Sequence, residues 1–121
     1  MFDAYRKGII EKGLTAEFDY LDTSTAFFWV PPGFNKHLSY AEVKSILLEN
    51  ANTIKFLEME WDTLRIEPVT RTLATYTGVM KSKTSDTAGN ITSSSLIESG
   101  VVIKREDGWK LLSGQTGTIQ Q

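Results

Sequence analysis

Three polar residues near the end of the chain, Glu98, Ser113 and Gln115, are the first candidates for chemistry. Asp107-Gly108 separates two apolar runs and favours a two-residue hairpin turn, which would place the three side chains on one face of the paired strands. Such a face could form the polar back wall of a pocket. A glutamate enclosed by apolar groups has a raised pKa and can act as an acid. The competing interpretation is a set of solvated side chains at the edge of a sheet.

His37 is the only histidine, so a Ser-His-Asp arrangement would have to run through it. It lies in a Gly-Phe-Asn-Lys-His loop and could serve as an acid–base group near the mouth of a pocket. A lone loop histidine is more often simply solvent-exposed. Neither His37 nor Glu98 comes with the partners that would complete a catalytic set.

Three acidic residues, Glu58, Glu60 and Asp62, have the spacing and charge to bind a hard cation. They alternate with apolar residues, which explains them more simply as the solvent face of a strand. We therefore predict neither a metal nor any other cofactor.

Trp29, Trp61 and Tyr76 are candidates for the wall of a ligand pocket. Aromatic side chains offer a large apolar area with a polar atom at one end. The alternative is that they pack in the core for structural reasons alone.

The composition indicates one globular α+β domain spanning residues 1–121, with 40% hydrophobic residues. The absence of cysteine excludes a disulfide framework and a thiol nucleophile. The net charge of −2, without a basic stripe, argues against nucleic acid as a partner. No apolar run reaches the ~20 residues of a membrane span, and no secretion signal opens the chain. We expect a cytoplasmic protein that binds no membrane.

The first 21 residues predict two short helices. Phe2, Tyr5 and Ile9 share one helical face, and Gly13 suits the end of that helix. Thr15 is the expected cap of the second helix. Its inward side chains would be Leu14, Phe18 and Leu21.

A short strand and the clearest helix signal follow. The apolar run Phe27–Val30 is β-prone and ends at two prolines, which cannot donate to a sheet. Ser39 and Glu42 have the spacing of a capping box, so a helix begins there. Its apolar stripe would consist of Val43, Ile46 and Leu47.

From residue 53 the pattern alternates with a period of two, which predicts long antiparallel strands. The parity shifts near Asp62-Thr63, as a β-bulge would cause. Residues 69–83 and 93–105 should form a long hairpin, and the Asp107-Gly108 turn should start the last one. Its expected pairs are Val102 with Ser113, Gly100 with Gln115, and Glu98 with Gly117.

This order of elements, with the Phe27-Phe28-Trp29-Val30-Pro31 strand and the closing segment GVVIKREDGWKLLSGQT at residues 100–116, resembles the nuclear transport factor 2-like superfamily. Within it, the chain looks like the SnoaL-like and ketosteroid-isomerase-like branch. The resemblance implies a cystatin-like cone, in which a strongly curved sheet wraps the amino-terminal helices and leaves a pocket. It also implies a homodimer formed through the outer face of the sheet.

The resemblance further implies where isomerase residues would lie. The general-base aspartate of those enzymes corresponds to Val30, which cannot accept a proton. Tyr5 lies near the position of their oxyanion-hole tyrosine. Their partner acid corresponds to Gly100, with Glu98 nearby on the same strand. Ser113 and Gln115 stand where many relatives have histidines.

We therefore expect a domain that binds a small apolar or amphipathic molecule, without a complete catalytic constellation. The ligand-contacting residues would be Trp29, Trp61, Tyr76, Glu98, Ser113 and Gln115. One alternative is an isomerase, cyclase or dehydratase that uses Glu98 or His37 as acid–base and Tyr5 as electrophile. Another is a homodimeric interaction module.

Overall fold

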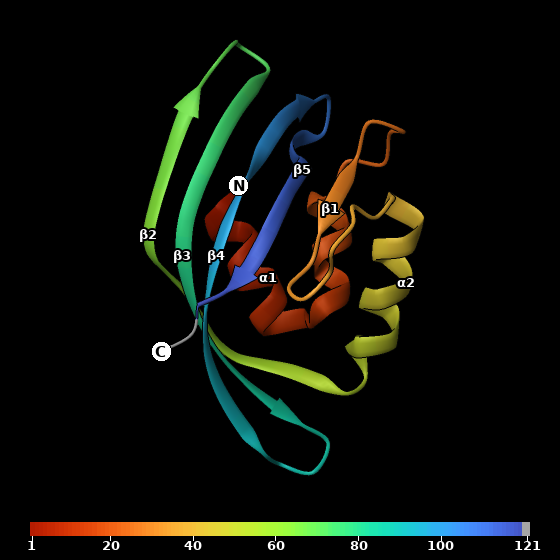
Figure 1. Ribbon diagram of the computed structural model, residues 1–121, viewed down its shortest axis with the longest axis vertical. Helices are drawn as coiled ribbons and strands as arrows, with labels where there is room; N and C mark the ends of the chain where they lie inside the picture. Colours follow the sequence, from red (N-terminus) through yellow and green to blue (C-terminus); the bar gives the residue numbers. More distant parts are fainter. Residues whose placement is uncertain (120–121) are drawn as a thin grey trace.

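The computed structural model describes residues 1–119 and shows a curved sheet that wraps around the amino-terminal helices (Figure 1). The chain runs through α1 (Phe2–Lys12), the 3-10 helix η1 (Leu14–Tyr20), β1 (Phe28–Val30) and α2 (Tyr40–Ala51). Four long strands follow: β2 (Ile54–Pro68), β3 (Leu73–Asp86), β4 (Ile91–Arg105) and β5 (Gly108–Thr118). The strand order is β1-β5-β4-β3-β2. The expected α+β cone is confirmed.

The four long strands are antiparallel neighbours, and β1 joins β5 in parallel at one edge. β2 forms the opposite edge, and its register against β3 shifts between Trp61 and Thr63. The predicted bulge at Asp62 is thus confirmed. A second shift, between Phe56 and Glu58, leaves Leu57 out of the ladder and exposed. Two bulges bend β2, as extra residues in one strand increase its curvature.

The concave side of the sheet holds the core. α1 lies inside the curve, and α2 stands beyond β1 at the open side (Figure 1). Ile9 of α1 is 1% exposed and packs in one cluster with Tyr76 and Met80 of β3. No residue of α2 is fully buried, so this helix covers the cone loosely. The predicted capping box of α2 is confirmed, because Ser39 accepts from the backbone of Glu42 and Glu42 from that of Ser39.

The two amino-terminal helices meet at Gly13. Gly13 has a φ of 90°, which glycine adopts without steric cost, and its N–H caps α1 by donating to Ile9 O. The prediction that Thr15 caps the second helix was wrong: Gly13 is its N-cap, and Leu14 is already buried within it. Gly13 alone separates the two helices, so it is the C-cap of α1 and the N-cap of η1.

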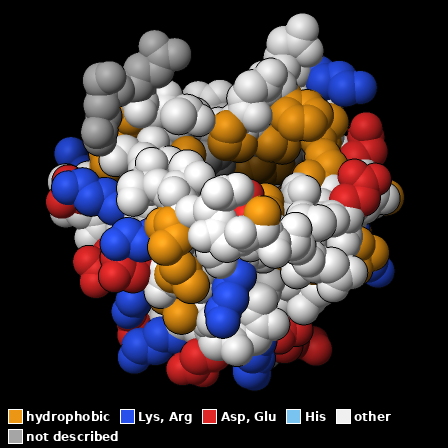
Figure 2. Space-filling view, turned by 90° about the horizontal axis from the view of Figure 1, so that it is seen from below, with side chains coloured by type: hydrophobic (Ala, Val, Ile, Leu, Met, Phe, Trp, Pro, Cys, Tyr) orange, Lys and Arg blue, Asp and Glu red, His pale blue; other side chains and the backbone are white. Residues whose placement is uncertain are grey.

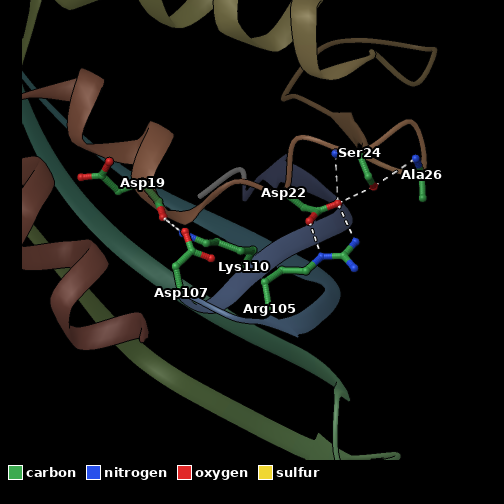
Figure 3. Close-up of polar contacts among 7 residues, drawn as sticks. All are labelled: Asp19, Asp22, Ser24, Ala26, Arg105, Asp107 and Lys110. Carbon is green, nitrogen blue, oxygen red and sulfur yellow. Dashed lines mark hydrogen bonds and ion pairs between the residues drawn. The ribbon is translucent and has the colours of Figure 1, made fainter.

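A cluster of hydrogen-bonded polar residues connects the end of η1 to the region of the turn between β4 and β5 (Figure 3). Asp22, only 4% exposed, receives two hydrogen bonds from Arg105, at 2.7 Å and 3.2 Å. Ser24 also donates to Asp22, and Lys110 donates to the backbone oxygen of Asp19. The hydrogen bonds from Arg105 hold the pKa of Asp22 below its ordinary value. The cluster therefore fixes η1 against the sheet.

Candidate functional site

The concave side of the sheet encloses a cavity of about 200 Å3 between the sheet and the helices. Seen from the end that carries the β3–β4 turn, the molecule is hollowed, and the hollow is lined with hydrophobic side chains (Figure 2). Every helix and strand in residues 1–119, or a residue beside it, contributes to the lining. The lining is mostly apolar and includes a few polar groups. These features are typical of small-molecule sites. The lining consists of Tyr5, Ile9, Leu14, Glu17, Trp29, Pro31, Pro32, Val43, Ile46, Leu47, Phe56, Met59, Met80, Leu96, Glu98 and Thr116.

Glu98 of β4 is the hydrogen-bonded centre of one polar group in this cavity. Tyr76 of β3 donates its hydroxyl proton to Oε2 of Glu98 at 2.8 Å. Thr116 of β5 donates to Oε1 at 3.1 Å and itself accepts the indole N–H of Trp29 at 3.0 Å. Three neighbouring strands, β3, β4 and β5, together with β1, therefore fix the orientation of this carboxyl group.

Glu17 of η1 is the second carboxyl group in the cavity. Tyr5 of α1 donates its hydroxyl proton to Oε1 of Glu17. Within residues 1–119 the hydrogen bond to Glu17 goes to Oε1 and leaves Oε2 without a partner, and the Glu17 side chain lines the cavity. Each glutamate is thus paired with a tyrosine, but only Glu17 keeps an oxygen free for a bound molecule.

The two carboxyl groups influence each other electrically. Burial, which is the largest effect, and the negative charge of Glu98 raise the pKa of Glu17 to about 7, although the hydrogen bond from Tyr5 lowers it. Burial also raises the pKa of Glu98, although the hydrogen bonds from Tyr76 and Thr116 oppose the shift. Burial and the nearby carboxyl groups raise the pKa of Tyr5 and of Tyr76, so both remain protonated donors. Glu17 can therefore gain or lose a proton near neutral pH.

Several of the residues selected from the sequence come together here. Tyr5, Trp29 and Glu98 line the cavity, and Tyr76 holds Glu98 in place. Trp61 lies behind this layer, its ring 6.4 Å from that of Tyr76 and edge-on to it. It does not line the cavity, and its buried indole N–H finds no acceptor within the described part of the chain.

The predicted register of the last hairpin was wrong. The turn falls at residues 106–107, because Arg105 pairs with Gly108. Val102 then pairs with Leu111 and Val101 with Ser113, so Leu112 is an extra, bulged residue. A shift of one residue exchanges the two faces of a strand.

This shift decides which residues of β5 face inward. Gly100 pairs with Gly114, not with the expected Gln115. Glu98 pairs with Thr116, not with the expected Gly117. Ser113 and Gln115 do not line the cavity, and Gln115 is exposed in a groove of the outer surface beside Ile97 and Ser99. Thr116 faces inward, where the register predicted from the sequence would place Ser113 and Gln115.

The remaining candidates lie away from the cavity. His37 is exposed on its loop, with its ring 5.9 Å from that of Phe28. Glu58 and Asp62 on β2 are exposed and lie 3.9 Å from Lys83 and 3.8 Å from Lys81, respectively. In residues 1–119, no three histidine or acidic side chains gather in a way that could hold a metal ion. Nor is any helix there long and apolar enough to cross a membrane.

Sequence reasoning missed Glu17, although a signal was present. Glu17 lies three residues after Leu14 and four before Leu21, which is the spacing of one helical face. Both leucines are buried, so Glu17 turns inward with them. A carboxyl group on a predicted apolar face was the sign of a functional residue.

Comparison with known proteins supports the fold. No family model matches the chain, and no curated protein sequence matches it. Among solved structures, a nuclear transport factor 2-like superfamily protein from Salmonella enterica superposes with a TM-score of 0.79 and 15% identity, over 99% of this chain and 87% of that one. A ketosteroid isomerase-like protein from Erwinia carotovora superposes with a TM-score of 0.74 and 17% identity, over 99% of this chain and 92% of that one. A protein with a cystatin-like fold from Caulobacter vibrioides superposes with a TM-score of 0.72 and 12% identity, over 98% of this chain and 84% of that one.

Proposed function

We propose that this chain, which has the nuclear transport factor 2-like fold, binds a small and mainly apolar molecule inside its cone. The observation that carries the proposal is the 200 Å3 cavity with two carboxyl groups on an otherwise mainly apolar wall. Apolar cavities on the order of 150 Å3 hold a benzene molecule. A molecule with one six-membered ring and a short polar substituent therefore fits the available space.

NMR titration tests the proposal with benzyl alcohol, cyclohexanone and benzylamine as probes. The indole N–H of Trp29 is the reporter, because Trp29 lines the cavity and donates to Thr116. We expect at least one probe to shift this resonance saturably. Ile46→Phe should block the effect, since Ile46 lines the cavity and a larger side chain occupies its volume.

Leu48→Phe is the matched control, since Leu48 is on the same helix but 49% exposed and outside the cavity lining. It should leave binding unchanged. The proposal fails if none of the three probes shifts the Trp29 resonance, or if Ile46→Phe and Leu48→Phe have the same effect.

A second candidate function is acid–base catalysis on the bound molecule, favoured by the near-neutral pKa of Glu17 and by its Oε2, to which no residue of the described chain donates a hydrogen bond. An effective general base has a pKa near the working pH. Glu17 would remove a proton from the carbon beside a carbonyl group, which forms an enolate, and return a proton to the same carbon. In D2O, the chain should then catalyse deuterium incorporation into cyclohexanone. Glu17→Gln should abolish the exchange, and Glu60→Gln, on the outer face, should not.

We also propose that the protein forms a homodimer through the outer face of its sheet. Ile97 is 48% exposed and Phe34 is 44% exposed, and the two line one groove on this face. Ile97 also lines a second groove with Val79. Contiguous exposed apolar residues of this kind favour contact with another protein surface.

A further inference from the structure

The hydrogen-bond donors of the cavity are already used within the protein. Tyr5 donates to Glu17, and Tyr76 and Thr116 donate to Glu98. The indole N–H of Trp29 is taken by Thr116. A hydroxyl group has one proton to donate, so none of these groups has a second donor for a ligand. What remains unpaired is acceptor capacity, above all Oε2 of Glu17.

The charge of the cavity points in the same direction. Its lining, as the structure describes it, contains two glutamates and no lysine, arginine or histidine. Two carboxyl groups in a partly desolvated space repel each other when both are ionised. A positive charge placed beside both would remove this repulsion and supply the missing counter-ion.

Resting on the binding function proposed above, we propose that the molecule bound in the cavity is a small apolar amine. Its ammonium group contacts Glu17 and Glu98, and its hydrocarbon part lies against the apolar wall. An ammonium group donates up to three hydrogen bonds and so matches the unpaired acceptors. The charge-assisted bond to Oε2 of Glu17 is stronger than a bond between neutral groups.

Other classes of ligand fit this arrangement less well. A carboxylate would face two acidic groups without a cation to offset them. A neutral alcohol has one proton to donate and leaves the charge of the pair uncompensated. A ketone has no proton to donate, so one of the glutamates would have to be protonated to form a hydrogen bond with it.

The test compares three molecules of nearly the same shape: benzylamine, benzyl alcohol and benzoate. Calorimetric titration of the full chain at neutral pH measures each affinity. We expect benzylamine to bind at least about tenfold more tightly than benzyl alcohol, and benzoate to bind most weakly. Glu17→Gln and Glu98→Gln should each remove most of the preference for the amine, because each deletes one of the two charges.

Glu60→Gln is the matched control, because it makes the same change on an exposed residue of the outer face. It should leave the preference unchanged. Equal loss in Glu60→Gln and Glu17→Gln would mean that the amine responds only to the overall charge, and would overturn the inference. So would equal affinity of the parent chain for benzylamine and benzyl alcohol, although binding of the alcohol would still support the cavity function. Absence of binding by all three molecules would overturn both.

A measurement on the parent chain alone adds a test that does not depend on the folding of a variant. Within residues 1–119, the groups that donate hydrogen bonds to Glu17 and Glu98 are Tyr5 from α1, Tyr76 from β3 and Thr116 from β5, and none of them is cationic. An ammonium group favours the ionised form of both glutamates, so its binding at neutral pH should release protons. Titration in buffers of different ionisation enthalpy detects this release. Proton uptake on binding benzylamine would contradict the inference.

Discussion

Glu17 of η1 and Glu98 of β4 face one cavity, and each accepts a hydrogen bond from a tyrosine of another element, Tyr5 and Tyr76 respectively. Distant parts of the chain thus bring two carboxyl groups close enough for the charge of Glu98 to raise the pKa of Glu17. Such a pair is costly for stability, which suits a functional role better than a structural one.

The first prediction concerns the pH dependence of stability. The pKa of Glu17 is about 7 in the folded chain and 4.5 by its ordinary value, so between these pH values the folded state holds more protons than the unfolded state. The contribution of Glu17 to the free energy of unfolding therefore falls as pH rises from about 4.5 to about 7.

Glu17→Gln removes this loss. As pH rises from 4 to 8, the free energy of unfolding of the variant should increase relative to that of the parent by up to about 3 kcal/mol. This figure follows from about 1.4 kcal/mol per unit of pKa shift. Urea unfolding across this range measures the difference. Glu60→Gln should show no such trend, and a constant offset between Glu17→Gln and the parent would contradict the assignment.

The second prediction concerns the ion pair that anchors η1. Asp22→Asn leaves Arg105 without its ionic partner and should destabilise the chain by about 2 kcal/mol. This cost is smaller than that of breaking a fully buried ion pair, because Arg105 is partly exposed. The pKa of Asp22 is lowered in the folded chain, so its stabilisation is present above about pH 4 and is lost as pH falls below that value. Thermal unfolding at pH 7 and at low pH measures both effects.

Asp107→Asn is the control for that prediction. Asp107 pairs with Lys110 on the surface and is 74% exposed, so solvent replaces the interaction readily. If Asp107→Asn reduced stability as much as Asp22→Asn, burial of the Asp22–Arg105 pair would be unimportant.

The third prediction tests the packing of Trp29 against β5. A Cβ atom at Gly114 would lie 2.6 Å from the backbone oxygen of Ser99 and 2.8 Å from the Trp29 ring. Gly114→Ala should therefore cost about 1–3 kcal/mol, as overpacking does, and weaken binding in the cavity by displacing Trp29. At Gly117, on the same strand, the nearest atom would be 3.5 Å away, so Gly117→Ala should be tolerated. Chemical unfolding of both variants decides between these outcomes.

The fourth prediction tests the proposed dimer. Ile97→Lys places a charge at the centre of the outer-face grooves and should convert dimers to monomers in sedimentation analysis at micromolar concentration. Ile91→Lys, at a 63% exposed position where β4 begins, should have no effect. A parent chain that is already monomeric would rule the proposal out.

Local interactions account for what the sequence determined without help from the fold. Ser39 and Glu42 cap α2 through their own backbone neighbours, and Gly13 ends α1 because glycine tolerates its positive φ. The bulge at Asp62 was visible as a change of parity in the alternating pattern. These signals involve residues a few positions apart, so they are present in the sequence itself.

Tertiary structure alone decided which side chains meet in the cavity. The bulge at Leu112 exchanges the faces of β5, and no local pattern marks it, because Leu111 and Leu112 are equally apolar. Thr116 points inward as a result, and Gln115 is exposed. The raised pKa of Glu17 likewise depends on Glu98 and on the walls that remove water from both. Register and desolvation are properties of the packed sheet, which is why Tyr5, Trp29 and Glu98 could be named in advance, whereas Glu17, Thr116 and the arrangement of the cavity could not.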